Sequence, residues 1–179
     1  MRGKSMLCRR GVVAGSVIIA SVAFLAPAAQ AALRFREFAV PTLDSAPFQI
    51  TAGPDGNLWF TELYGGKIGR ITTQGAIVEF TVPTADSYPF GITAGPDGNL
   101  WFTENAADKI GRMTTAGVVT GEFPLPPTSY PDGITAGPDG NLWFTETGTN
   151  KIGRMTTAGA ESGALEMNPW IYGPIMAPG

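Results

Sequence analysis

The amino-acid sequence predicts an all-β fold made of three β-propeller-type blades that form an incomplete ring. A unit of 42 residues occurs three times, Gly and Pro interrupt the chain every few residues, and residues 32–179 show no helical periodicity of useful length. Repetition with a period of about 20 to 50 residues indicates a repeat architecture, and four-stranded units of this length that stack face to face are propeller blades.

The first half of each unit is identical in the three copies. The block Ile-Thr-Ala-Gly-Pro-Asp-Gly-Asn-Leu-Trp-Phe-Thr-Glu occupies residues 50–62, 92–104 and 134–146. Pro-Asp-Gly separates two β-rich runs, so we predict a hairpin of residues 48–52 and 57–62, in which Gly takes the positive-φ position of the turn. The consecutive apolar residues Leu-Trp-Phe predict that both faces of the second strand are buried.

The second half of each unit supplies two further strands. Lys-Ile-Gly-Arg recurs at residues 67–70, 109–112 and 151–154, and each copy leads to a turn that ends at Gly75, Gly117 or Gly159. In the first unit these patterns predict strands at residues 67–72 and 77–82. The pair Glu-Phe, at residues 37–38, 79–80 and 122–123, opens the next unit.

The two ends of the repeat region depart from the pattern. Residues 35–40 match the fourth strand of a unit and suit a closure in which a terminal strand completes another blade. We assign residues 32–159 to the three blades and residues 160–179 to a non-repeat tail, in which at best Glu166-Met167 stands where Glu-Phe is expected. Because about four to eight blades close a ring, we expect either assembly with further copies or a chain that is the front part of a longer propeller.

Residues 1–31 have the three parts of a secretory signal peptide. Four basic residues precede a mainly apolar run at residues 11–27, and Ala29 and Ala31 are small residues at the cleavage position. We predict cleavage after Ala31 and a secreted or periplasmic product, with ordinary or twin-arginine export left open. The apolar run is shorter than the about 20 residues that cross a bilayer, so we predict no membrane span.

The remaining chain is acidic and has no cysteine. Residues 1–31 hold four of the twelve basic residues, no acidic residue and the single cysteine, Cys8, so residues 32–179 carry eight basic and fifteen acidic residues, a net charge of −7. Such a surface repels phosphate backbones, and we expect no nucleic-acid partner. Stability must come from packing rather than from disulfides.

The repeated block, followed by Lys-Ile-Gly-Arg and then Ile or Met and two threonines, closely resembles the repeat of the streptogramin B lyases, also called virginiamycin B lyases. The resemblance covers roughly residues 35–159. It implies a seven-bladed propeller and, for true members, a Mg²⁺-dependent elimination that opens the ring of a streptogramin B antibiotic and confers antibiotic resistance. Fold transfers more safely than activity between proteins that share a repeat.

The catalytic histidines that this resemblance implies are missing. The family's histidines follow the Trp-Phe-Thr-Glu strand in particular blades, whereas Leu63-Tyr64, Asn105-Ala106 and Thr147-Gly148 stand there in this chain, which contains no histidine. A base that works near neutral pH is therefore absent unless a carboxylate with a raised pKa replaces it. We predict no catalytic residue and no cofactor, with Mg²⁺ only if the chain is a true lyase.

The repeated Glu at the end of the Trp-Phe-Thr-Glu strand is a weak candidate for a metal ligand. These residues are Glu62, Glu104 and Glu146. Because a propeller site is usually made where the repeats differ, we favour a structural role in which Glu62 pairs with Lys67 or Arg70 across the hairpin. The Asp of each Pro-Asp-Gly-Asn lacks the spacing of an EF-hand, so we interpret it as a turn residue rather than a calcium ligand. Each Trp lies in a central apolar strand, and we interpret it as core that packs between blades.

The positions that vary between units are the better ligand-binding candidates. They lie in the loops after the Trp-Phe-Thr-Glu strands, where a rigid scaffold holds variable side chains. We single out Tyr64, Asn105, Asp108 and Asn150. Drift between duplicated units would produce the same variation.

Three functions remain open from the sequence. The first is a secreted binding or scaffold module, or a truncated family member, with a small-molecule or peptide ligand. The second is a lyase of the streptogramin B type, a carbon-oxygen lyase. The third is a homo-oligomeric interaction protein, because an isolated arc of three blades would expose apolar end faces.

Overall fold

The computed structural model describes residues 35–159 and 165–166, and these form three four-stranded antiparallel sheets. All three sheets belong to a compact unit that begins at Glu37. The first sheet comprises β1 (Pro47–Ala52), β2 (Leu58–Glu62), β3 (Lys67–Ile71) and β4 (Ile77–Thr81). The second comprises β5 (Pro89–Ala94), β6 (Leu100–Glu104), β7 (Lys109–Met113) and β8 (Val119–Pro124). The third comprises β9 (Pro131–Ala136), β10 (Leu142–Glu146), β11 (Lys151–Met155) and β12 (Leu165–Glu166).

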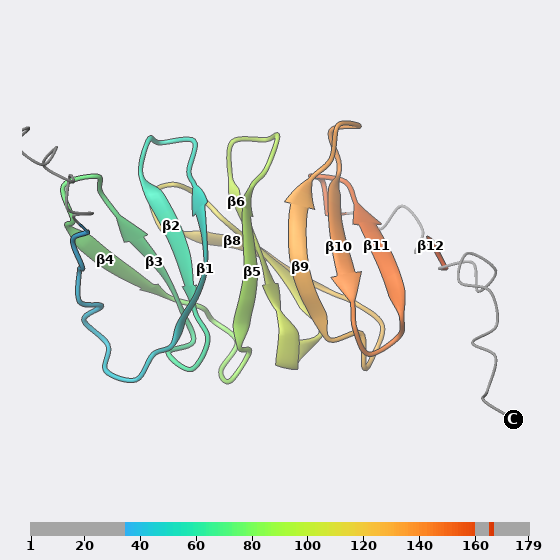
Figure 1. Ribbon diagram of the computed structural model, residues 1–179. Helices are drawn as coiled ribbons and strands as arrows, with labels where there is room; N and C mark the ends of the chain where they lie inside the picture. The colour runs from blue at the N-terminus through green and yellow to red at the C-terminus, as the bar shows by residue number, and fades with distance from the viewer. Residues whose placement is uncertain (1–34, 160–164, 167–179) are drawn as a thin grey trace, which may run out of the picture. The chain divides into compact units, whose positions relative to one another are not determined.

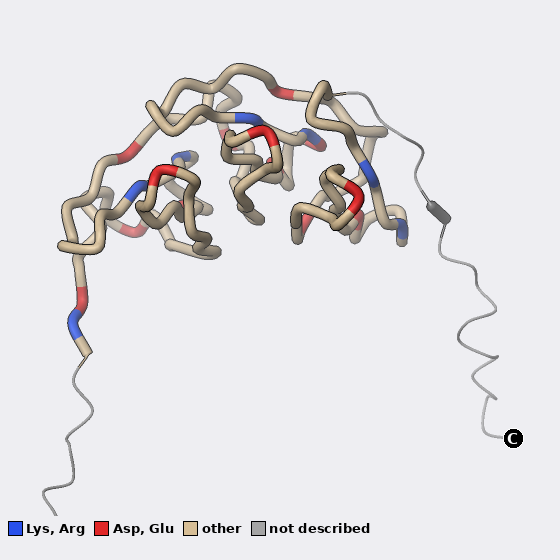
Figure 2. Tube along the Cα trace, turned by 90° about the horizontal axis from the view of Figure 1, so that it is seen from above, with Lys and Arg blue, Asp and Glu red and all other residues tan. Residues whose placement is uncertain are grey.

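The sheets are the blades of an incomplete β-propeller, as the repeat predicts. They stand side by side in chain order, and Figure 2 shows the same succession from above. One turn of 3-10 helix, η1 (Asn105–Ala107), joins β6 to β7. The predicted strands of the first unit are confirmed to within one residue at each end. No helix in the described part of the chain is long and apolar enough to cross a membrane.

The Pro-Asp-Gly-Asn turns behave as the sequence predicts, and they lie along the upper edge of Figure 1. Gly56 has φ +76°, and the Asp55 carboxylate accepts hydrogen bonds from the Asn57 backbone N–H at 3.2 Å and from the Trp59 indole N–H at 3.0 Å. Burial opposes the effect, but the hydrogen bonds from the Asn57 side chain, the Trp59 indole and the Asn57 backbone keep the pKa of Asp55 below its usual value. The turn therefore also fixes the orientation of the core Trp.

Each blade packs on the next through two matched faces. In the first blade we call the face that carries Trp59 of β2 and Ile68 of β3 the trailing face, and the opposite face the leading face. The equivalent faces of the other two blades have the same names. The trailing face of the first blade meets the leading face of the second in one buried cluster, and the same match joins the second blade to the third. The first cluster comprises Trp59, Ile68, Val82, Ile92, Leu100, Phe102 and Met113. The second comprises Trp101, Ile110, Leu125, Ile134, Leu142, Phe144 and Met155.

A repeated threonine bonds neighbouring blades together. The Thr61 hydroxyl accepts a hydrogen bond from the Gln49 backbone N–H at 3.1 Å and donates one to the Phe90 carbonyl of the next blade at 2.8 Å. Thr103 repeats the arrangement, with 2.7 Å from the Gly91 N–H and 2.8 Å to the Asp132 carbonyl. Each hydroxyl thus satisfies one backbone group on either side of a blade interface.

Residues 35–40, which match the fourth strand of a unit in sequence, pair with none of the three described sheets, and the closure that they suit stays a prediction. This segment is largely exposed and has no regular secondary structure, because each of the three sheets already pairs its third strand with a segment of its own. The Phe38 ring nevertheless covers Gly75, as Phe80 covers Gly117 in the next blade. The Phe38 side chain therefore takes the position of a fourth-strand Phe, although residues 37–40 form no strand pairing in the described chain.

The register of β12 differs from the prediction. Leu165 pairs with Ile152 and Glu166 with Lys151. In the other blades the residue opposite this Ile is the Phe of Glu-Phe, as for Phe80 opposite Ile68. By this register Leu165 stands at the Phe position, one residue before the Glu166 that the sequence pattern placed at the Glu of Glu-Phe.

Candidate functional site

The variable loops of the three blades gather at the end of the unit opposite the Pro-Asp-Gly turns (Figure 1). We call this edge the loop end; it consists of residues 41–46, 63–66, 83–88, 105–108, 125–130 and 147–150. Backbone hydrogen bonds tie the loops together in pairs, from the Tyr64 N–H to the Ser45 carbonyl at 3.0 Å and from the Ala106 N–H to the Ser87 carbonyl at 3.1 Å. The loops therefore form one continuous, hydrogen-bonded surface rather than a set of separate turns.

Two of the predicted ligand-binding residues occupy a position that the turn itself requires. Gly66, Asp108 and Asn150 are equivalent, with φ values of +59°, +51° and +57°. Gly, Asp and Asn are the residues that best tolerate the left-handed region, so the variation at this position follows turn geometry. The Asp108 carboxylate also accepts hydrogen bonds from the Thr128 and Tyr130 backbone N–H groups, at 2.8 and 2.7 Å.

Asn105 and Tyr64 differ in how much of their side chains is available. The Asn105 amide donates a hydrogen bond to the Pro131 carbonyl at 3.0 Å and so links the second blade to the third. Tyr64 is 69% exposed and meets Tyr88 edge to face, with ring centroids 6.1 Å apart. The ligand-binding role of all four residues stays a prediction, and Tyr64 is the one whose ring faces solvent.

A small pocket lies beside these two tyrosines. Its volume is about 150 Å³, and it lies between the loop that follows β2 and the loop that leads into β5. Tyr64, Gly65, Thr84, Asp86 and Tyr88 are among its lining residues. The arrangement combines aromatic faces with hydroxyl and carboxylate oxygens, which suits an aromatic or amphipathic group that also donates hydrogen bonds.

The repeated glutamates lie beneath the loop end and are almost fully buried. Glu62 and Glu104 have no exposed surface and Glu146 is 4% exposed. Neither carboxylate oxygen of Glu62 or of Glu104 has a hydrogen-bond partner among the described residues, whereas Glu146 accepts a hydrogen bond from the Thr149 hydroxyl at 2.9 Å. Their structural environment is thus a desolvated pocket under each loop.

Burial raises the pKa values of Glu62 and Glu104. Desolvation is the main cause at both Glu62 and Glu104, and for Glu104 the nearby Glu122 carboxylate adds to it and brings the pKa to about 7. The Ser87 hydroxyl offsets part of this rise, but its geometry falls short of a hydrogen bond. Glu104 is therefore a carboxyl group that titrates near neutral pH.

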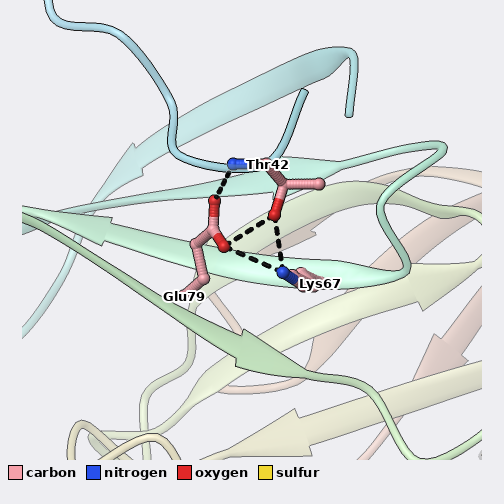
Figure 3. A network of polar contacts seen from close by, with 3 residues as sticks. All are labelled: Thr42, Lys67 and Glu79. Carbon is pink, nitrogen blue, oxygen red and sulfur yellow. Dashed lines mark hydrogen bonds and ion pairs between the residues drawn. The ribbon is translucent and has the colours of Figure 1, made fainter. Parts of the chain in front are cut away.

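The predicted pairing of Glu62 with Lys67 or Arg70 is wrong. Figure 3 shows that the Lys67 ammonium pairs with Glu79 instead, at 2.8 Å, and also donates a hydrogen bond to the Thr42 hydroxyl at 2.6 Å. Thr42 in turn donates two hydrogen bonds to the Glu79 carboxylate, at 2.9 and 2.7 Å. The ion pair forms with the carboxylate that keeps some contact with water, because two fully buried charges would lose more hydration.

Arg70 has a different role from the one predicted. Its guanidinium lies over the Trp59 ring, 5.6 Å from the centroid, and donates a hydrogen bond to the Thr115 carbonyl of the next blade at 3.2 Å. Arg112 repeats both contacts on Trp101 and Thr157. The arginines therefore seal the blade interfaces.

Sequence reasoning missed the serines and threonines of the loop end. Ser45, Ser87 and Ser129 are fully or almost fully buried and recur at the 42-residue offset, as do Thr42 and Thr84. Their spacing was the available signal, but the segments around them differ enough between units to hide it. The side chains of Thr42 and Thr84 and the backbone carbonyls of Ser45 and Ser87 form hydrogen bonds that hold these loops in place.

The residues of the loop end do not fit a magnesium site. Mg²⁺ binds oxygen ligands in octahedral geometry and usually keeps several waters. The three buried glutamates lie in separate blades without solvent access, and no group of three or more acidic, His or Cys side chains in the described residues could hold a metal. The buried glutamates of the described blades therefore do not face a ligand at the loop end, whereas the Asp86 carboxylate in the pocket lining is exposed.

The chain is similar to virginiamycin B lyases. The model of the Virginiamycin B lyase family matches residues 29–163. A virginiamycin B lyase of Bacillus licheniformis is 48% identical over 45 residues, which are 25% of this chain and 15% of that protein. One of Saccharopolyspora erythraea is 50% identical over 43 residues, which are 24% of this chain and 14% of that protein.

Solved structures give the same result over a longer stretch. A selenomethionine-substituted virginiamycin B lyase from Staphylococcus aureus superposes with a TM-score of 0.72 and 50% identity, covering 75% of this chain and 46% of that one. A catalytically inactive variant of the S. aureus enzyme, solved with quinupristin, has a TM-score of 0.71 and 50% identity and covers 74% and 45%. This chain thus spans less than half the length of the structures it matches.

Proposed function

Since this chain belongs to the virginiamycin B lyase family, we propose that its three blades form a ligand-binding segment that does not open the ligand's ring. The observation that carries the proposal is the pocket between Tyr64 and Tyr88 at the loop end. The chain has no histidine, so a neutral-pH elimination has no histidine to use as acid or base, whereas the blade fold of the family is present.

The ligand class that we propose is a cyclic depsipeptide of the streptogramin B type. The S. aureus relative that was solved with quinupristin is 50% identical to this chain over the shared blades. A pocket of about 150 Å³ is smaller than the roughly 300 Å³ at which drug-sized sites begin. It therefore accommodates one aromatic or amphipathic group of the ligand, and the rest lies along the exposed loops.

The test is a calorimetric titration of quinupristin into the purified chain, with and without Mg²⁺, followed by mass analysis of the ligand. We expect saturable binding in both conditions and an intact ring. Tyr64→Ala should weaken binding about two- to tenfold, because one aromatic contact contributes roughly 0.5 to 1.5 kcal/mol.

Tyr130→Ala is the matched control, because Tyr130 is the equivalent of Tyr88 and faces a loop in which Ala106 replaces Tyr64. Its affinity should equal that of the unaltered chain. Absence of binding, or an equal loss in both variants, would exclude the pocket as the recognition site.

A second candidate is lyase activity of the streptogramin B type, and one observation favours it. The pKa of Glu104 is about 7, which is the range that a general base needs near neutral pH. The carboxylate has no exposed surface, so it would act only after the loops above it open. Ring-opened product that disappears in Glu104→Gln but persists in Glu122→Gln would establish this function in place of the first.

We also propose that the chain is exported and that the signal peptide is removed. Residues 1–31 lie outside the described residues, and their sequence pattern supports the proposal. Mass analysis of protein recovered from the periplasm or medium should give an N-terminus at Ala32. An intact N-terminus at Met1 in the exported fraction would contradict cleavage.

A further inference from the structure

The two outer faces of the three-blade unit carry the same residues that pack together inside it. The leading face of the first blade presents Ile50 and Leu58, which are 58% and 37% exposed. Their equivalents in the second blade, Ile92 and Leu100, are 1% and 0% exposed because the first blade covers them. The difference is due only to the presence or absence of a neighbouring blade.

The trailing face of the third blade is the complementary half. Trp143 is partly exposed, whereas Trp59 and Trp101 are completely buried under the next blade. A hollow of about 380 Å³ reaches this face at Trp143, Thr145 and Ile152, and it is also lined by Ile134 and Phe144 of the same blade and by Gln49 of the first blade. The leading face of the first blade has a hollow of about 320 Å³, lined in part by Ile50, Phe60 and Ile71. Apolar hollows of this kind are typical of surfaces that pack against a partner.

From this repetition we propose that two copies of the chain associate head to tail, the trailing face of each third blade packing on the leading face of the other copy's first blade. The occupant of each face is therefore a second copy, because the chain itself shows twice how these residues pack. Two copies give six blades, within the range of about four to eight that closes a ring. Closure also leaves no apolar face exposed, as a symmetric pair requires.

The segment that begins at Glu37 extends the same interface. Phe38 covers Gly75 as the fourth-strand residue Phe80 covers Gly117, so residues 37–40 already lie where the fourth strand of a preceding blade would lie. In the ring this preceding blade is the third blade of the other copy. Residues 37–40 replace the two-residue strand β12 as the neighbour of its β11.

The interior register specifies the new strand pairing. Ile68 is opposite Phe80 and Ile110 is opposite Phe123, so Ile152 of one copy is opposite Phe38 of the other. By the same register Glu37 approaches Lys151, as Glu79 approaches Lys67 at 2.8 Å.

Light scattering after gel filtration tests the association without any antibiotic, so its outcome is independent of the proposed ligand. We expect a discrete species of about twice the chain mass. Ile50→Lys should convert it into a monomer, because a charge cannot be buried unpaired in the interface. Val118→Lys is the matched control, since Val118 is also 58% exposed but belongs to neither face, and it should leave the dimer intact.

A zero-length carbodiimide cross-link tests the strand exchange directly. In a mixture of isotope-labelled and unlabelled copies, Glu37 of one copy should link to Lys151 of the other and give a mixed-mass peptide. A folded monomer, a ladder of open oligomers, a dimer that survives Ile50→Lys, or links only within one copy would each overturn the proposal.

Discussion

Replacing Glu104 by Gln should make the protein less sensitive to pH. Glu104 has no exposed surface, and burial raises its pKa from 4.5 to about 7, so the folded state holds this proton more tightly than the unfolded chain. The unfolded chain binds fewer protons between these two values, and stability therefore falls as pH rises through them. A shift from 4.5 to about 7 corresponds to a loss of about 3 kcal/mol in the free energy of unfolding, complete only above the folded-state pKa.

The assay is urea denaturation followed by tryptophan fluorescence, for both proteins near pH 4 and near pH 8 at one protein concentration. The buried amide that the substitution introduces adds its own cost, about 1 to 3 kcal/mol, but that cost is the same at both pH values. The stability difference between variant and parent should hence move by about 3 kcal/mol in favour of the variant at the higher pH. A difference that does not change with pH would refute the assignment of a raised pKa to Glu104.

Three further substitutions can be measured by the same denaturation experiment. Thr103→Val removes two hydrogen bonds at a blade interface and should lower the free energy of unfolding by about 2 kcal/mol. Thr145→Val, on the exposed trailing face, should lower it clearly less when both are measured in a monomeric background such as Ile50→Lys. Equal losses would contradict the bridging role of Thr103. Gly117→Ala should cost more than about 1 kcal/mol, because φ is +84° there and an aromatic ring occupies the Cβ position; an unchanged midpoint would contradict this packing. Glu79→Gln should destabilise the fold at neutral pH and less in acid. Desolvation opposes the effect, but hydrogen bonds and the Lys67 ammonium lower the pKa of Glu79, so the stability that its carboxylate contributes is present above pH 4.5 and is lost as pH falls. A destabilisation by Glu79→Gln that grows in acid would contradict this assignment.

The sequence predicts the blades well because the repeat encodes both the turns and the packing. The Gly of each Pro-Asp-Gly turn has a positive φ, and Trp59 and Trp101 are core residues, as their place in a consecutive apolar strand indicates. Local turn chemistry and strand burial are properties of short segments, so they are visible without the fold. The terminal segments are different, because whether residues 35–40 pair depends on a neighbouring strand that is not adjacent in sequence.

The candidate site is less predictable, since its side chains choose among several partners. Lys67 has carboxylates at both Glu62 and Glu79 within its neighbourhood, and only the structure shows that Thr42 completes the pair with Glu79. The variation at Asp108 and Asn150 looked like a sign of ligand specificity, but the positive φ at this position is a sufficient cause. Burial and backbone geometry determine the partner of Lys67 and restrict the residue types at positions 108 and 150, and neither can be derived from residue type alone.

The matched faces have a consequence for how the gene can change. Because every trailing face presents the same Trp and Ile and every leading face the same Ile, Leu and Phe, a unit that is duplicated or deleted in frame meets a compatible neighbour on both sides. Slippage between nearly identical coding segments can therefore lengthen or shorten the array by whole blades, and no interface has to be redesigned afterwards. Selection then acts on the number of blades and on the loop residues separately.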